Sequence, residues 1–184
     1  MSHALFDLKS RVAVVIGGTT GLGRSIALGL AEAGAEVVPS SRRPEQVDAV
    51  AAQIEALGRR SLRLTCDVLS RASIQALHDA VIAAFGKVDI LVNAAGITSM
   101  APTLESSEQD WARVIDTNLY GTLRACQIFG VTMVRAGYGR IVNIASLSSF
   151  VGFAGIAAYS ASKSAVASLT KVLAIELAQS GVNR

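Results

Sequence analysis

The sequence predicts an α/β fold in which a doubly wound parallel sheet is covered by helices on both faces, giving three layers. Short aliphatic runs alternate with segments of helical periodicity along the whole chain. Hydrophobic residues make up 51% of the 184 positions and aromatic residues only 5%, which suits strands buried under helices. Strands that alternate with helices are joined by right-handed crossovers and pair in parallel.

The apolar patterns assign strands and helices along the chain in order. The expected strands are short apolar or alternating runs: residues 12–16, 36–39, 61–66, 88–92 and 141–145. The expected helices carry apolar residues at helical spacing: residues 22–33, 44–57, 74–85, 108–117, 119–136 and 158–179. Pro44 suits a first helical turn, and Gly34, Gly58 and Gly86 stand where three of the helices end. Because no linker interrupts this order, we expect one domain over residues 1–184.

Charge and hydropathy argue against a nucleic-acid or membrane partner. Lys and Arg number 17 and Asp and Glu 14, with no basic block among them, so nucleic-acid binding is not indicated. The longest apolar region, residues 150–169, is interrupted by glycines, serines and Lys163 and does not predict a membrane span. The first residues carry Asp7 and lack an apolar core, so we expect no secretory signal and a cytoplasmic location.

Cysteines and histidines show no metal-ligand spacing. Cys66 and Cys126 each lie alone in an apolar stretch, so we expect two buried, reduced thiols. His3 and His78 are the only histidines, and neither has other ligand residues clustered around it in the sequence. We therefore expect no metal site, and we look for function elsewhere in the chain.

A glycine-rich turn follows the first expected strand and leads directly into a helix. Its residues are Gly17-Gly18-Thr19-Thr20-Gly21-Leu22-Gly23. Glycines permit a tight turn and close approach of a pyrophosphate, and the helix N-terminus offers free N–H groups to that anion. The position after the first strand predicts a Rossmann-like dinucleotide site, although a turn that only connects a strand to a helix has the same composition.

The second strand ends at Ser40-Ser41-Arg42-Arg43, which bears on the choice of nucleotide. Folds selective for NAD place an acidic residue at this point to accept hydrogen bonds from the ribose hydroxyls. Ser41 stands there instead, and Arg42 follows with a guanidinium suited to a phosphate group. We therefore expect NADP(H) rather than NAD(H). The alternative is that Arg42 and Arg43 form a solvated loop beside Glu45.

Tyr159 and Lys163 are one helical turn apart and project from the same face. A free tyrosine phenol ionises near pH ~10, and a neighbouring ammonium favours its phenolate form. Such a pair can exchange a proton with an alcohol or carbonyl, but it occurs on many helices. Ser146 adds weight because it follows an expected strand at the edge where open α/β sheets bind ligands. Asn118, in an apolar helix, needs buried hydrogen-bond partners.

Taken together, these segments resemble the short-chain dehydrogenase/reductase family over essentially the whole chain. The matching motifs, in order, are GGTTGLG (17–23), CDV (66–68), NAAG (93–96), NLYG (118–121), IVNIAS (141–146) and YSASK (159–163). The resemblance implies that Tyr159 is the general acid/base and that Lys163 assists it and binds the nicotinamide ribose. It also implies that Ser146 positions the substrate oxygen and that Asn118 holds a water linking Lys163 to solvent.

The same resemblance assigns the remaining nucleotide contacts. Asp67 and Val68 would contact the adenine, whereas Asn93, Ala94 and Gly96 would support the cofactor and the central strand. Ala94 stands where the family usually has a second asparagine, and Ile16 stands where it usually has a threonine. Neither change removes a group needed for the chemistry. The turn residues Gly17, Thr19, Thr20, Gly21, Leu22 and Gly23 complete the expected cofactor set together with Ser41 and Arg42.

Two further expectations follow from the resemblance. The chain ends at Arg184, where relatives enter their next strand, so we expect the last strands and the substrate-covering segment to be absent. The apolar helix at residues 119–136 should be buried on more than one side. It and the final helix, at residues 158–179, would pair across a dimer axis, within a dimer or a tetramer.

The predicted activity is the interconversion of a carbonyl and a secondary alcohol with NADP(H). The resemblance is about equally good to 3-oxoacyl-carrier-protein reductases and to sugar-acid or polyol dehydrogenases, so the substrate stays open. The alternative function is a nucleotide-binding scaffold or redox sensor without catalysis. Retention of Asn118, Ser146, Tyr159 and Lys163 favours the enzyme, because a sensor needs only the cofactor site.

Overall fold

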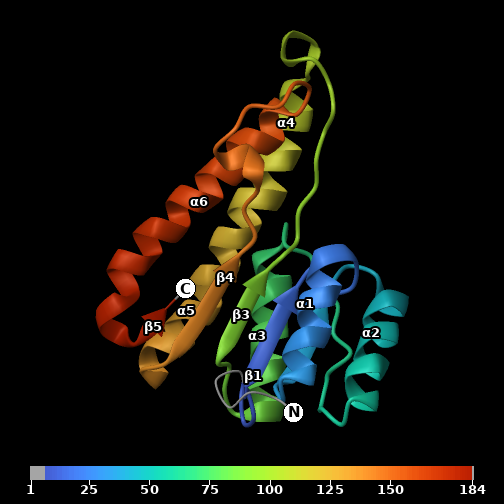
Figure 1. The fold of residues 1–184 in the computed structure, drawn as a ribbon, viewed down its shortest axis with the longest axis vertical. Coiled ribbons are helices and arrows are strands. Elements are labelled where there is room, and N and C mark those ends of the chain that lie inside the picture. Colours follow the sequence, from blue (N-terminus) through green and yellow to red (C-terminus); the bar gives the residue numbers. More distant parts are fainter. Residues whose placement is uncertain (1–6, 184) are drawn as a thin grey trace.

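The computed structural model describes residues 7–183. Most of the N-terminal segment in which we expect no secretory signal lies outside the described residues. The strands are β1 (Val12–Ile16), β2 (Glu36–Ser40), β3 (Ile90–Asn93), β4 (Gly139–Asn143) and β5 (Val182–Asn183). They form a five-stranded sheet in the order β2-β1-β3-β4-β5, and every neighbouring pair is parallel (Figure 1). This confirms the predicted parallel α/β architecture.

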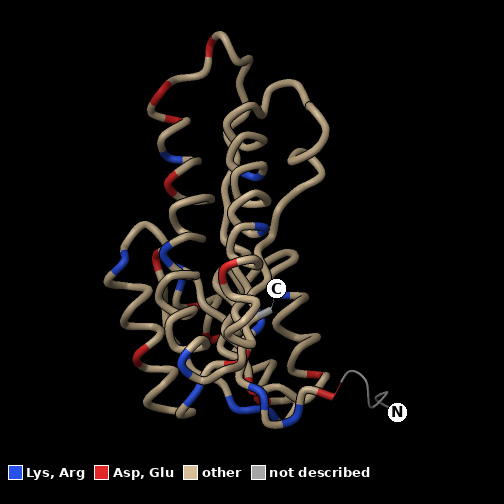
Figure 2. The backbone as a smooth tube through the Cα atoms, turned by 90° about the vertical axis from the view of Figure 1, so that its left-hand side faces the viewer, with Lys and Arg blue, Asp and Glu red and all other residues tan. Residues whose placement is uncertain are grey.

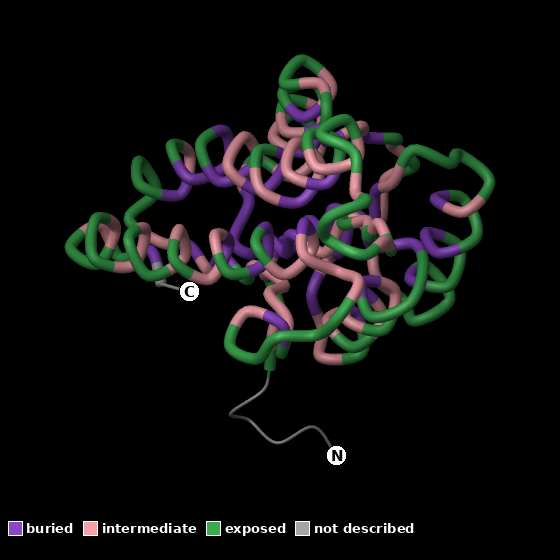
Figure 3. Tube along the Cα trace, turned by 90° about the horizontal axis from the view of Figure 1, so that it is seen from above, coloured by how far each residue is buried: buried purple, intermediate pink, exposed green. Residues whose placement is uncertain are grey.

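Helices cover the sheet on both of its faces, as expected for a doubly wound fold. They are α1 (Gly21–Glu32), α2 (Pro44–Ala56), α3 (Arg71–Phe85), α4 (Glu108–Ile115), α5 (Gly121–Ala136) and α6 (Ala157–Leu177). Alternate residues of β1 point to opposite faces. Ala13 and Val15 pack with α1 and α2, whereas Val14 and Ile16 pack with α3 and α5. Burial is therefore greatest along the strands at the centre of the molecule (Figure 3).

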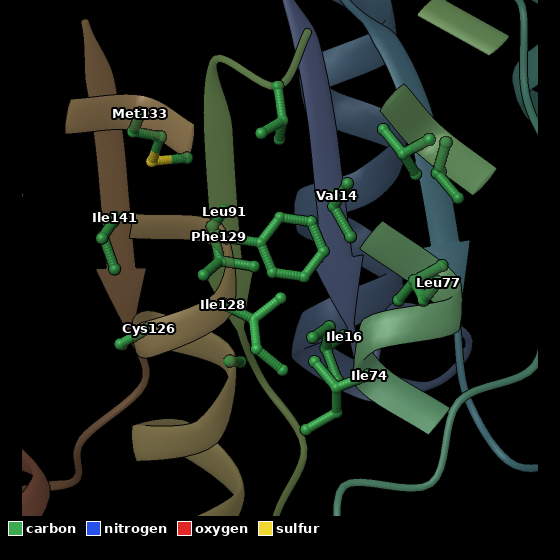
Figure 4. Packing of buried hydrophobic residues seen from close by; sticks show 14 of the residues in the cluster. Val14, Ile16, Ile74, Leu77, Leu91, Cys126, Ile128, Phe129, Met133 and Ile141 are labelled. Atoms are coloured by element: carbon green, nitrogen blue, oxygen red, sulfur yellow. The ribbon is translucent and has the colours of Figure 1, made fainter. Parts of the chain in front are cut away.

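Phe129 fills the centre of the larger core, between the sheet and α3. It is the largest fully buried side chain and lies among Leu91 of β3, Val14 of β1 and Ile128 of its own helix (Figure 4). Val131 and Val134, on the outer side of α5, remain 51% and 37% exposed. Thr122, Cys126 and Gly130 are buried as well as Phe129, so burial extends around more than one side of α5, as expected, and only its outer side stays exposed in the chain by itself.

Residues 61–66 do not form the predicted strand. The segment is extended beside β2 and makes separate hydrogen bonds to it, including Cys66 N–H to the Ser41 carbonyl at 2.9 Å and Ser40 Oγ to the Leu64 carbonyl at 2.6 Å. The Ser40 hydroxyl thus donates to a carbonyl that would accept from a backbone N–H group in a regular pair of β-strands. The segment still ends at the same sheet edge as the strands, which places Asp67 near Ser41.

The two helices predicted at residues 108–117 and 119–136 form one continuous path. A π-helical turn, Asp116–Tyr120, joins α4 to α5 without a break. Turns of this kind often occur at functional positions in helices, because the wider turn redirects side chains. Here the turn carries Asn118, which is completely buried.

No helix within residues 7–183 is both long and apolar enough to cross a bilayer.

The order of the strands locates the position where a ligand is expected. The chain runs outward from β1 to β2 and then returns to place β3 on the other side of β1. At such a reversal, the loops leaving the two central strands diverge and open a crevice beyond their carboxyl ends. The loop after β1 is the glycine-rich turn, and the loop after β3 begins with Ala94.

Candidate active site

The glycine-rich turn lies against the loop that follows β3, and two glycines are required by this close contact. Gly17 has a φ of +83°, and a Cβ there would overlap the backbone at Ala95. A Cβ at Gly23 would overlap the carbonyl oxygen of Gly17. The N–H groups of Gly17 and Gly18 donate to the Ser40 carbonyl at 2.7 and 3.2 Å, which fastens the turn to β2.

A cavity of about 350 Å³ opens beside this turn, at the carboxyl edge of the sheet. Eleven residues expected to bind the cofactor line it: Gly17, Thr19, Thr20, Leu22, Gly23, Ser41, Arg42, Asp67, Val68, Ala94 and Gly96. Gly21, Asn93, Tyr159 and Lys163 belong to the expected cofactor set but are not among its lining residues. Asn93 instead donates to Asn143 Oδ1 at 2.8 Å, which links β3 to β4 beneath the cavity.

Several lining residues were not anticipated from the sequence. They are Ile16, Arg43, Cys66, Leu69, Ala95, Ile97, Arg113, Thr117 and Ile144. Arg113 and Thr117 are one turn apart where α4 meets the π-helical turn, so they face the cavity together. Their spacing was visible in the sequence, but nothing in it showed that this face of the helix would meet the nucleotide cavity.

Hydrogen bonds fix two of the polar groups of the cavity wall. Thr19 is buried, and its hydroxyl donates to Gln46 Oε1 at 3.2 Å, which ties the turn to α2. Ser41 Oγ accepts a hydrogen bond from the Arg43 N–H at 3.3 Å. With Arg42, Arg43 and Arg113 on its wall, the cavity carries a cationic surplus over Asp67, which suits a ligand with several phosphate groups.

Lys163 lies buried beside Gly96 and Ile144, two residues of the cavity wall, but it does not line the cavity itself. Its ammonium donates to the Ile144 carbonyl at 2.6 Å, and its Nζ would lie 3.5 Å from a Cβ placed on Gly96. Nζ is also 5.8 Å from the centroid of the Tyr159 ring. Burial lowers the pKa of the Lys163 ammonium, because the charged form loses hydration. The structure thus brings Tyr159 and Lys163 together, as the spacing predicts, and places Lys163 beside Gly96.

Asn118 uses its side chain to hold three segments together. Its Oδ1 accepts from the Ile97 N–H at 2.8 Å, and its Nδ2 donates to the Ile97 carbonyl and to Ser162 Oγ, both at 2.9 Å. Ser162 Oγ in turn donates to the Tyr159 carbonyl at 2.7 Å. The loop after β3, the π-helical turn and the start of α6 are therefore fixed relative to one another around Gly96.

Ser146 begins a short 3-10 turn, Leu147–Ser149, and is held there by a capping box. Its Oγ accepts a hydrogen bond from the Ser148 N–H at 3.2 Å, while its own N–H donates to Ser149 Oγ at 3.3 Å. Because the hydroxyl oxygen is already an acceptor, its proton stays available for a substrate oxygen. The residue is half-buried, as is Tyr159.

Both cysteines are buried and free, as the sequence predicts. Burial raises the pKa of each thiol to about 11, because a thiolate would lose its hydration. Cys66 lies on the cavity wall, whereas Cys126 lies beneath the sheet against Asn93 and Asn143. Neither thiol is therefore an activated nucleophile at neutral pH.

The model of the family described as short chain dehydrogenase matches residues 11–183. The chain belongs to the short-chain dehydrogenase family. D-threitol dehydrogenase of Mycolicibacterium smegmatis is 42% identical to this short-chain dehydrogenase over 177 residues, covering 96% of this chain and 68% of that protein. The 2-dehydro-3-deoxy-D-gluconate 5-dehydrogenase of Escherichia coli is 41% identical over 184 residues, covering 100% and 72% of the two chains.

Solved structures of relatives share the fold of this short-chain dehydrogenase. A gluconate 5-dehydrogenase from Burkholderia cenocepacia, solved in complex with NADP and tartrate, has 36% identity and a TM-score of 0.92. The match covers 98% of this chain and 71% of that one. Relatives of this similarity are named as dehydrogenases or reductases, so the chain is an oxidoreductase that acts on alcohol or carbonyl groups with a nicotinamide cofactor.

Proposed function

We propose that this chain interconverts a carbonyl and a secondary alcohol with NADP(H), with Tyr159 as the general acid/base. The observation that carries the proposal is the placement of Lys163. Its ammonium is buried between the Tyr159 ring and Gly96, and Gly96 lines the nucleotide cavity. A scaffold that only binds nucleotide has no need for a buried cation beside a tyrosine, because such burial is costly.

The residues of the cavity fit a dinucleotide along its whole length. The glycine turn and the start of α1 suit the pyrophosphate, Asp67 and Val68 suit the adenine, and Gly96 leaves room beside Lys163. When bound, the nicotinamide would supply or accept the hydride. No other redox group is needed for this reaction class.

The side chains near Gly96 can handle the proton. In the reducing direction, the Tyr159 phenol donates its proton to the substrate oxygen while the Ser146 hydroxyl donates a hydrogen bond to the same oxygen. The Lys163 ammonium, held by the Ile144 carbonyl, then stabilises the phenolate. Asn118 acts through its contacts to Ile97 and Ser162, which fix the positions of the segments; its proposed water contact stays a prediction.

Arg42 is proposed to select NADP(H) over NAD(H). Replacing it with alanine should lower kcat/KM for NADPH by roughly 10- to 100-fold, the range for a hydrogen bond to a charged group, and leave that for NADH nearly unchanged. Steady-state kinetics with both cofactors measure this. Arg135→Ala, an exposed position at the end of α5, is the control. A wild-type preference for NADH would contradict the assignment.

We also propose that the chain associates with itself through α5 and α6. Val131 and Val134 on α5 and Val172 and Ile175 on α6 are exposed, with Ile175 as much as 80% accessible. Apolar side chains gathered on neighbouring helices are typical of a surface that a partner covers. A second copy would bury them, as a dimer or as part of a tetramer. The cytoplasmic location stays a prediction.

A further inference from the structure

The turn at residues 67–70 contributes the part of the cavity wall that is proposed to contact the adenine. Its backbone is fixed from within, because the Ser70 N–H donates to the Asp67 carbonyl at 3.1 Å and the Leu69 N–H donates to Asp67 Oδ1 at 3.0 Å. The N–H of Val68 has no acceptor among residues 7–183. Asp67 and Val68 both line the cavity, so its wall offers a carboxylate acceptor next to an N–H donor.

A carboxylate next to an N–H group complements one edge of adenine. That edge carries an amino group, which donates, beside the ring nitrogen N1, which accepts. The Asp67 carboxylate can accept from the amino group, and the Val68 N–H can donate to N1. Hypoxanthine carries an oxo group and an N1–H group at the same two positions, so both pairs would be mismatched and their polar groups left without partners.

Arg124 of α5 holds the carbonyl group of Val68. Its Nη1 donates to the Val68 carbonyl at 3.1 Å, and its Nη2 lies 2.7 Å from Asp116 Oδ1. The guanidinium carbon also lies 5.8 Å from the centroid of the Tyr120 ring. Acidic and basic residues follow one another along the continuous path of α4, the π-helical turn and α5 (Figure 2). The Arg124 side chain is only 24% exposed, so its ion pair is less screened by solvent than an open surface pair.

The first residue of α5 holds Val68 at its side chain. A Cβ placed on Gly121 would lie 2.8 Å from Val68 Cβ and 3.5 Å from the Val68 carbonyl oxygen, so the helix packs directly against this residue. Val68 is accordingly buried. Because the packing does not depend on Arg124, removal of the guanidinium would free the Val68 carbonyl while the turn stays in place.

We propose that Arg124 is a positioning residue for the nucleotide and makes the site selective for adenine. By binding the Val68 carbonyl, it keeps the Val68 N–H and the Asp67 carboxylate directed at the edge of the base. Arg124 itself is not among the residues that line the cavity, so it acts through Val68. This role rests on the proposed function, because it places the adenine of NADP(H) beside the turn at residues 67–70.

Titration with two matched nucleotides tests this role. The full chain would be titrated with NADPH and with its hypoxanthine analogue, and nicotinamide fluorescence would report both affinities. The wild type should bind NADPH more tightly. Arg124→Met keeps most of the side-chain stem and should lower the ratio of the two affinities by at least about fivefold, within what one or two neutral hydrogen bonds contribute. Equal affinities of the wild type for the two nucleotides, or an unchanged ratio in Arg124→Met, would overturn the proposal.

Two further variants separate positioning from a general loss of stability. Arg71→Met removes an exposed arginine that also bonds to α5, through Gln127 Oε1 at 2.8 Å, but does not line the cavity, so its affinity ratio should match that of the wild type. Arg124→Lys keeps a cation that can reach the Val68 carbonyl and should restore most of the wild-type ratio. An equal fall in Arg71→Met, or no recovery in Arg124→Lys, would overturn the proposal. Protein that binds both nucleotides with the expected ratios but reduces no ketone would refute only the proposed function.

Discussion

Tyr159→Phe is expected to lower kcat for carbonyl reduction by about 10²- to 10⁴-fold, the usual contribution of a positioned proton donor. The change removes only the phenol oxygen, so packing around the ring at the start of α6 should persist. NADPH should still bind with an affinity within about tenfold, because one neutral hydrogen bond is worth about 0.5–1.5 kcal/mol. Steady-state rates and fluorescence titration of NADPH measure the two effects.

The control for this substitution is Tyr138→Phe. Tyr138 lies beside Arg11 and Arg140, whose guanidinium carbons are 4.0 and 4.6 Å from its ring centroid. It is next to the first residue of β4 and therefore at the opposite edge of the sheet from Ser146. Loss of its hydroxyl should leave kcat unchanged. If Tyr159→Phe retained the activity of Tyr138→Phe, Tyr159 would not be the proton donor.

Gly23→Ala is expected to weaken NADPH binding by at least about tenfold and to destabilise the fold by about 1–3 kcal/mol, the usual cost of overpacking. The added methyl group would overlap the Gly17 carbonyl oxygen, and Ala94 Cβ would lie 3.1 Å away. The turn must then shift relative to the loop after β3. Urea unfolding and nucleotide titration measure the two losses.

Gly29→Ala supplies a matched control on the same helix. A Cβ at Gly29 meets nothing within 4 Å, so the same substitution adds no contact there. Because alanine favours the helix over glycine, this variant should gain up to about 1 kcal/mol of stability and bind NADPH as the wild type does. Equal effects of the two substitutions on NADPH affinity would contradict the close contact inferred at Gly23.

Local pattern predicted most of the sheet, because buried parallel strands appear as short aliphatic runs. Residues 61–66 were the exception. Their alternation is that of a strand, but hydroxyls of Ser40 and Ser61 bond to carbonyls across the gap, and this competes with a regular ladder. The π-helical turn was also missed, since the apolar spacing of residues 108–136 is compatible with two helices or one. A π-helical turn contains one residue more than an α-helical turn, and no local sequence pattern indicates where that extra residue is inserted.

The sequence was also informative about which residues meet in the candidate site. Gly17, Asp67, Gly96 and Ser146 all follow extended segments, and the carboxyl ends of parallel segments share one edge. What sequence reasoning could not supply were the contacts made across the fold. The pairing of Asn118 with Ile97 depends on how the helix approaches the loop after β3, and the cavity lining by Arg113 has the same origin.

The most direct test of the account follows the hydride and the proton together. Wild-type protein and Tyr159→Phe would each be loaded with NADPH deuterated at C4 and mixed with a neutral methyl ketone, and the alcohol would be analysed by mass spectrometry. We expect deuterium at the carbinol carbon with the wild type and almost no alcohol with Tyr159→Phe, although both bind the nucleotide. Alcohol without deuterium from either hydrogen of C4, or equal yields from the two proteins, would contradict it.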